Sequence, residues 1–144
     1  PLQPALDRIL GVALTLGKCD IAVLSLETFE ESKVPSSYLL HLGGGDDGVE
    51  EYVAAVVKEA NQLVSHDEAA LQLQTSDGVV FPFALHRELG HGWLYLETQD
   101  LDELQQQAMT VLCGHAANVL YSTVAQGMLM ARQDQVEDFD VMSI

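Results

Sequence analysis

The chain is 144 residues long, an ordinary length for one domain, and 48% of its residues are hydrophobic, so it can bury a core without disulfides or metals. Its 22 acidic and 6 basic residues give a formal charge of −16, which argues against nucleic acid and membrane surfaces as partners. The same field repels an anionic small ligand, so a neutral or cationic ligand is favoured.

The two cysteines, Cys19 and Cys113, are too few and too far apart in sequence for a zinc site. Two thiols without a signal peptide are typical of a reducing compartment, so we expect a cytoplasmic protein. No apolar run approaches the roughly 20 residues that a membrane-spanning helix needs.

The first half of the chain alternates between helical and extended patterns. Apolar residues recur at helical spacing from Leu2 to Leu16, with Gly17 placed to end the helix. Residues 20–27 are rich in aliphatic side chains, as a central strand would be, and residues 37–42 form its partner. Helical spacing returns from Val49 to Leu63, with Asp46 or Asp47 as its N-cap.

The next segments predict three strands in a meander. Residues 69–75 alternate between polar and apolar side chains, and a Ser-Asp-Gly turn leads into a strand at 79–85. Pro82 in that strand indicates an edge or a bulge. Gly90-His91-Gly92 is predicted as a second turn, before a strand at 93–97.

The last predicted element is a helix of about eight turns that starts near Leu101, with Asp100 as its cap. Its apolar band is wider than one packing face requires, because Met109, Cys113, Ala116, Ala117 and Met128 extend it. We therefore expect this helix to meet the sheet on one side and a second surface on the other. Residues 1–132 form the predicted domain, and the acidic segment 133–144 is expected to be mobile.

This order of elements predicts an α+β fold. A central five- or six-stranded antiparallel sheet, with the first and last helices on one face and the middle helix on the other, covers every apolar face.

Several segments, taken in order, resemble the GAF family of sensory and regulatory domains. The residues that carry the resemblance are 19–24 (Cys-Asp-Ile-Ala-Val-Leu), 63–67 (Leu-Val-Ser-His-Asp), 81–85 (Phe-Pro-Phe-Ala-Leu), 92–97 (Gly-Trp-Leu-Tyr-Leu-Glu) and the closing 104–120 helix. The family's cyclic-nucleotide motif is missing, and neither cysteine stands where bilin-binding members attach their chromophore. The resemblance implies a GAF-like fold with a ligand pocket between the sheet and the middle helix.

The candidate ligand-binding residues are the aromatic and histidine side chains that could line such a pocket. They are Tyr38, His41, Tyr52, His66, Phe81, Phe83, Trp93 and Tyr95. Trp93 and Tyr95 alternate with two leucines, and the sequence leaves open which pair faces the pocket.

Other groupings have simpler interpretations than catalytic or metal sites. His86 and His91 lie close in sequence but would project from different parts of a hairpin, so a solvated turn is favoured over a metal site. The residues of Ser65-His66-Asp67 point in different directions and cannot form a catalytic relay. Haem held by one of the five histidines is an alternative, although His115 is interpreted as a polar residue in a helix interface.

The leading hypothesis is a non-catalytic regulatory module of a larger signalling protein. It would couple small-ligand binding or dimer state to an adjacent output domain, through the first and last helices of a parallel homodimer. The alternative is a dimerisation or docking scaffold that binds no small ligand. An enzymatic function would require a thiol activity, for which Cys19 and Cys113 are poorly placed.

Overall fold

The computed structural model describes residues 2–29, 36–43, 45, 47–67 and 69–142. Its elements, in chain order, are α1 (Leu2–Gly17), β1 (Ile21–Thr28), β2 (Ser36–Gly43), α2 (Val49–His66), β3 (Leu73–Gln74), β4 (Val79–Ala84), the 3-10 helix η1 (His86–Glu88), β5 (Gly90–Leu96) and α3 (Glu103–Met142).

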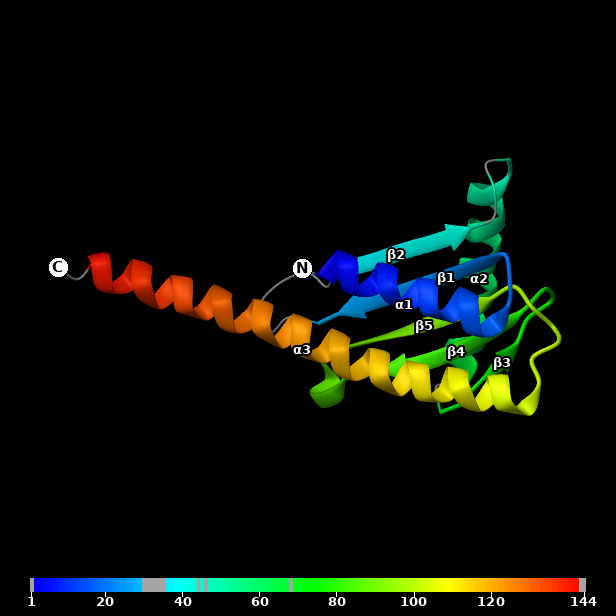
Figure 1. Ribbon diagram of the computed structural model, residues 1–144. Helices are drawn as coiled ribbons and strands as arrows, with labels where there is room; N and C mark the ends of the chain where they lie inside the picture. Colours follow the sequence, from blue (N-terminus) through cyan, green and yellow to red (C-terminus); the bar gives the residue numbers. More distant parts are fainter. Residues whose placement is uncertain (1, 30–35, 44, 46, 68, 143–144) are drawn as a thin grey trace.

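The strands form one antiparallel sheet in the order β2-β1-β5-β4-β3. Figure 1 shows α1 and α3 side by side across one face of this sheet. The α2 helix packs against the other face. The predicted α+β architecture, with its two terminal helices together, is therefore confirmed.

The larger core lies between the sheet and the two terminal helices. Leu24 and Leu26 of β1 and Leu94 and Leu96 of β5 alternate toward α1 and α3, and all four are at most 1% exposed. The inner side of α3 closes this core with Met109, Cys113, Ala116 and Leu120. Each large apolar side chain buried in this way contributes roughly 1.5–3 kcal/mol.

The smaller core lies between the sheet and α2. Val53, Val56 and Ala60 of α2 pack against Trp93 and Tyr95 of β5. Successive side chains of a strand point to opposite faces, so this placement shows which pair of β5 side chains faces α2. Trp93 and Tyr95 face α2, whereas the leucines between and after them face the terminal helices.

The starts of two helices differ from the predictions. The α2 helix begins after Gly48, which has φ of 73° and gives no side-chain cap, so Asp47 is not the cap; Asp46 lies outside the described residues.

The α3 helix is capped by Asp102 rather than Asp100. The Asp102 carboxylate accepts a hydrogen bond from the backbone N–H of Gln105 (2.7 Å), whose side-chain oxygen accepts one from the N–H of Asp102 (3.0 Å), a reciprocal cap that also satisfies a helix-end donor.

The β3–β5 meander is also more compact than predicted. The β3 strand has two residues, and it pairs only with Val79 and Val80 of β4. Pro82 therefore lies where the outer side of β4 has no described strand partner, as an edge proline should. The predicted turn at Gly90–Gly92 is wrong, because these residues begin β5 and the chain reverses through η1.

The last helix is longer than predicted. It continues from Glu103 to Met142, so the proposed boundary at residue 132 has no counterpart in the secondary structure. Figure 1 shows its final part projecting well beyond the sheet. The mobility of residues 133–144 stays a prediction. No helix among the described residues combines enough length and apolar character to cross a membrane.

Candidate functional site

Five of the eight predicted ligand-binding residues lie on the α2 side of the sheet. Tyr52, Trp93 and Tyr95 belong to the smaller core. His41 pairs in register with Val23, which faces α2, so His41 shares that face but is exposed. His66 lies in the last turn of α2, and its Nδ1 atom is 2.7 Å from the carbonyl of Gln62.

The other three predicted residues lie on the opposite face, which is a correction. Phe81 is 1% exposed in the larger core, and Phe83 and Tyr38 pack against the same core. Strand alternation is the physical reason, because Phe81 pairs in register with Leu94, and Tyr38 pairs with Leu26. These side chains cannot line a pocket between the sheet and α2.

Two tyrosines join α2 to the sheet at the centre of the candidate site. The hydroxyl groups of Tyr52 and Tyr95 are hydrogen-bonded to each other, and their ring centroids are 6.3 Å apart. Burial raises the pKa of Tyr52, and its hydrogen bonds to Tyr95 and Glu97 raise it further. Burial also raises the pKa of Tyr95, although hydrogen bonds with Tyr52 and Thr75 act in the opposite direction. Both phenols therefore stay neutral at physiological pH and offer hydroxyl groups for hydrogen bonding.

A small cavity of about 60 Å³ lies beside this tyrosine pair. It is lined by Tyr52, Ala55, Val56, Glu59, Thr75, Ser76, Asp77 and Tyr95. The space corresponds to about two water molecules, whereas pockets for drug-sized ligands measure roughly 300–1,000 Å³. In this conformation the gap between α2 and the sheet is filled by the protein's own side chains.

Polar contacts hold α2 in place on both sides of that cavity. The Glu59 carboxylate accepts hydrogen bonds from the backbone N–H and the hydroxyl of Ser76, at 2.9 and 3.1 Å. The indole N–H of Trp93 donates to the side-chain oxygen of Asn61, at 2.9 Å. These contacts anchor α2 to the β3–β4 turn and to β5, so a larger ligand could enter only if they open.

A second hollow of about 480 Å³, more open to solvent, lies at the same end of the sheet. Asp20, Ile21, Gly45 and Glu97 line it. Because Glu97 also contacts Tyr52, its carboxylate lies at the entrance to the tyrosine pair. Two carboxylates disfavour an anion there, in agreement with the charge of the whole chain. The residue pattern did not identify Asp20 and Glu97, since each is an ordinary charged residue next to a strand.

The two histidines near η1 do not converge on a common point. His91 of β5 lies 3.5 Å from the carboxylate of Glu27, on the α2 side of the sheet. His86 instead makes an edge-to-face ring contact with Tyr121 of α3, on the other side. Among the described residues, no three His, Cys, Asp or Glu side chains are grouped as metal ligands. Ser65 and His66 belong to the last turn of α2.

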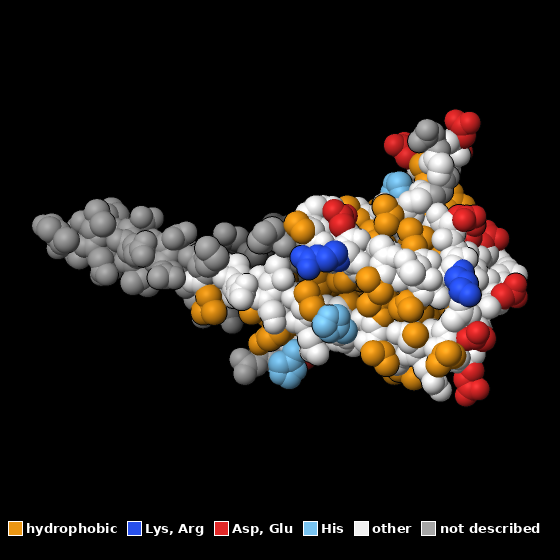
Figure 2. All heavy atoms as spheres, viewed as in Figure 1, with side chains coloured by type: hydrophobic (Ala, Val, Ile, Leu, Met, Phe, Trp, Pro, Cys, Tyr) orange, Lys and Arg blue, Asp and Glu red, His pale blue; other side chains and the backbone are white. Residues whose placement is uncertain are grey.

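The outer side of α1 and α3 is a second candidate site. We call this surface the α1–α3 face and define it by its exposed apolar residues Val12, Leu104, Val111 and Leu129, which are 45%, 75%, 71% and 63% exposed. Figure 2 shows hydrophobic side chains gathered across the face that α1 and α3 form, with most acidic side chains at its margin. His115, predicted to lie in a helix interface, is exposed on the outer side of α3.

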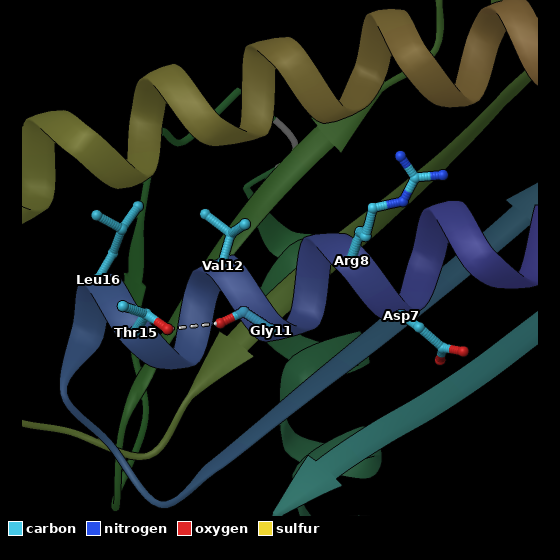
Figure 3. Close-up of a pocket in the computed structure, with 6 residues that line it drawn as sticks. All are labelled: Asp7, Arg8, Gly11, Val12, Thr15 and Leu16. Carbon is cyan, nitrogen blue, oxygen red and sulfur yellow. Dashed lines mark hydrogen bonds between the residues drawn. The ribbon is translucent and has the colours of Figure 1, made fainter.

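A shallow groove of about 550 Å³ runs over α1 on this face. Figure 3 shows Arg8, Val12 and Leu16 rising from α1 toward α3. A Cβ atom added at Gly11 would meet no atom within 4 Å, so a side chain of another molecule has room to lie there. The sequence predicted the surplus apolar area of α3 and a contact through both terminal helices, but not the groove over α1.

The α1–α3 face is also almost free of charge. Residues 104–131 contain no Asp, Glu, Lys or Arg, although the whole chain carries a formal charge of −16. A helix that faces water normally carries charged residues on its outer side. The absence of charge along this stretch marks the surface as one suited to contact with protein.

No family model matches the sequence, and neither does any curated protein. Among solved structures, SdiA in complex with octanoyl-rac-glycerol superposes with a TM-score of 0.56 at 13% identity, over 87% of this chain and 61% of the SdiA chain. The N-acylhomoserine lactone dependent LuxR family transcription factor CepR2 from Burkholderia cenocepacia superposes with a TM-score of 0.52 at 16% identity, over 84% of this chain and 86% of its own.

The photoproduct state of GAF3 from Slr1393 of Synechocystis sp. PCC6803 gives a TM-score of 0.49 at 14% identity, over 92% of this chain and 98% of its own. That score is too low to bear on the fold, so membership of the GAF family stays a prediction. The similarity to SdiA and CepR2 shows that this chain shares their α+β fold.

Proposed function

We propose that this chain is a non-catalytic regulatory module that forms a parallel homodimer through α1 and α3. A change in ligand occupancy or in pairing would be transmitted through α3 to an output domain of the same protein. The observation that carries the proposal is the α1–α3 face, which exposes large apolar side chains and whose α3 residues 104–131 include no charged residue in an otherwise acidic chain. Each Å² of apolar surface left in water costs roughly 25 cal/mol, so covering this face with a second copy is favourable.

The ligand part of the proposal draws support from the fold. Structures with this fold include SdiA, solved with octanoyl-rac-glycerol, and CepR2, described as N-acylhomoserine lactone dependent. In this chain the corresponding ligand would be neutral or cationic and would enter beside Tyr52 and Glu97, where carboxylates disfavour an anion. The free thiols of Cys19 and Cys113 agree with a cytoplasmic location.

Sedimentation equilibrium across the micromolar range tests the dimer. We expect the wild-type chain to sediment with the mass of two copies. Val111→Asp should raise the dissociation constant at least about hundredfold, because it buries an unpaired charge in the contact. Leu39→Asp is the matched control: Leu39 is a 50% exposed apolar residue, but it lies on β2 and on the α2 side of the sheet.

Leu39→Asp should leave the dimer unchanged. A wild-type mass of one chain throughout that range would overturn the proposal, as would equal effects of the two substitutions.

The second candidate function is a pairing scaffold that binds no small molecule. The observation in its favour is the cavity beside the tyrosine pair, which holds only about 60 Å³. Native mass spectrometry of the protein purified from cells separates the two functions. A retained mass, lost in a variant such as Tyr52→Ala that alters the cavity wall, supports the sensory module, whereas a bare dimer supports the scaffold.

A further inference from the structure

One row of α3 residues points away from the sheet, and we call it the outward line. It changes from apolar to polar and back to apolar along the helix. The residues that follow one another at heptad spacing on this line are Leu104, Ala108, Val111, His115, Asn118, Ser122, Ala125 and Leu129. The line is apolar at both ends, where Leu104 and Leu129 are strongly exposed. Its middle is polar, since His115, Asn118 and Ser122 are all exposed. The line therefore has a polar segment of about two turns between two apolar segments.

We infer that His115, Asn118 and Ser122 form a polar layer between two copies of this chain, that the layer sets a parallel register, and that protonation of His115 weakens the pair. This inference rests on the proposed dimer. In a parallel pair each of these residues faces its own equivalent, and one polar position in such a seam is enough to select register and partner direction. An antiparallel pair that matches Leu104 with Leu129 would instead place Ser122 against Val111 of the partner, which buries a hydroxyl group against an apolar side chain.

The charged residues on α3 and on the elements packed against it decide whether two imidazolium groups could be accommodated in the layer. On α3 itself, residues 104–131 carry no charged side chain. The charged residues of α1 are Asp7 and Arg8, and Figure 3 shows Arg8 rising toward α3 while Asp7 points away from it.

The remaining elements packed on α3 are β4 and η1. Residues 79–84 of β4 contain no titratable side chain. The 3-10 helix η1 (His86–Glu88) contains His86, Arg87 and Glu88, so its one positive and one negative residue offset each other, and its His86 ring contacts Tyr121. Arg8 is therefore the charged α1 side chain that is directed toward α3.

Two effects of acidification have opposite signs, and this makes the inference testable. Histidine side chains gain a proton within the range of about pH 8 to pH 5. For the whole chain, such protonation reduces the formal charge of −16, which should favour association. In the polar layer it would place two imidazolium groups together, which disfavours association. If acidification raises the dimer dissociation constant, the cause must therefore be repulsion at a local site and not the change in overall charge.

The test is the dimer dissociation constant by sedimentation equilibrium at about pH 8 and about pH 6. For the wild type we expect about a tenfold increase at the lower pH, which is the order of magnitude of one like-charge contact that water still screens. His115→Gln should remove the increase, because it keeps a polar side chain without a titrating group. His41→Gln, which changes an exposed histidine on the α2 side of the sheet, should keep it. Circular dichroism confirms that each variant is folded.

Cross-linking tests the register separately from the pH effect. Asn118→Cys should form an intermolecular disulfide under mild oxidation, because residue 118 faces its own equivalent in the parallel pair. Thr110→Cys is the control, since Thr110 is exposed but lies on a different side of α3, and the unsubstituted chain controls for Cys19 and Cys113.

The outcomes distinguish the two proposals. A wild type that stays monomeric at both pH values contradicts the dimer itself. If the wild type forms a dimer whose affinity does not decrease on acidification, the polar layer is overturned but the dimer is not. The same conclusion follows if the affinity of the His115→Gln dimer decreases as much as that of the wild type. Equal cross-linking of Asn118→Cys and Thr110→Cys does the same.

Discussion

The outer surfaces of α2 and α3 are built for different surroundings. The α2 helix carries Glu50, Glu51, Lys58 and Glu59 along its length, and its large apolar side chains are at least half-buried. The α3 helix has no charged residue between 104 and 131, yet exposes three large apolar side chains there. Both helices bury an apolar stripe against the sheet, so the difference lies entirely in the side that faces away from it. The outer side of α2 is that of an ordinary surface helix, whereas the outer side of α3 is suited to a second contact, as the proposed dimer requires.

The largest effect should come from the inner side of α3. Leu120 is fully buried, whereas Leu129 is 63% exposed on the same helix. Leu120→Ala should lower the free energy of unfolding by about 3 kcal/mol through lost burial and the cavity left behind. Leu129→Ala should change it by less than about 0.5 kcal/mol when pairing is removed by Val111→Asp. Urea unfolding in that background measures both, and similar losses would mean that α3 does not have distinct inner and outer sides.

A smaller effect is expected on the α2 side, from the hydrogen bond between Tyr52 and Tyr95. A double-mutant cycle with Tyr52→Phe and Tyr95→Phe should give a coupling free energy of about 1 kcal/mol, the usual contribution of a partly buried hydrogen bond. Urea unfolding of the four chains supplies the cycle. Additive losses would show that α2 is held by packing alone, and not also by this polar link.

The smallest effect should appear at alkaline pH. The pKa values of Tyr52 and Tyr95 are raised in the folded chain, with burial as the first cause, and an unfolded phenol titrates near pH 10. The stability that the neutral phenols contribute is thus fully present below about pH 10 and is lost as the pH rises above it. The free energy of unfolding of Tyr52→Phe should fall less steeply than that of the wild type between about pH 9 and pH 11. Parallel slopes for the two chains would contradict this.

The sheet and its three helices could be predicted because their signals are periodic and long. Strand alternation predicted that Leu94 and Trp93 lie on opposite faces of the sheet. Which of them faces α2 became known only from the positions of the helices. The short features were harder, because several polar residues near a helix start can each serve as its cap. Asp100 and Asp102 have the same side chain, and only the geometry with Gln105 selects Asp102.

The candidate site was predicted in part. Tyr52, Trp93 and Tyr95 were identified from their aromatic character and do meet. The same argument failed for Phe81, Phe83 and Tyr38, because aromatic side chains are equally suited to the larger core on the other face. Gly11 and the groove over α1 were not identified, since an open space above a glycine has no sequence signal.

The length of α3 has a mechanical consequence. Among the side chains that the structure describes, Val124 is the last of α3 to pack against the larger core, and the helix continues to Met142, a distance of about 27 Å at 1.5 Å per residue. An arm of that length magnifies movement at its base, so a tilt of about 5° between helix and sheet would displace the tip by about 2 Å. Adjustments too small to disturb the packing of Met109 and Leu120 would then move the far end by about as much as helices shift at subunit interfaces, roughly 1–2 Å.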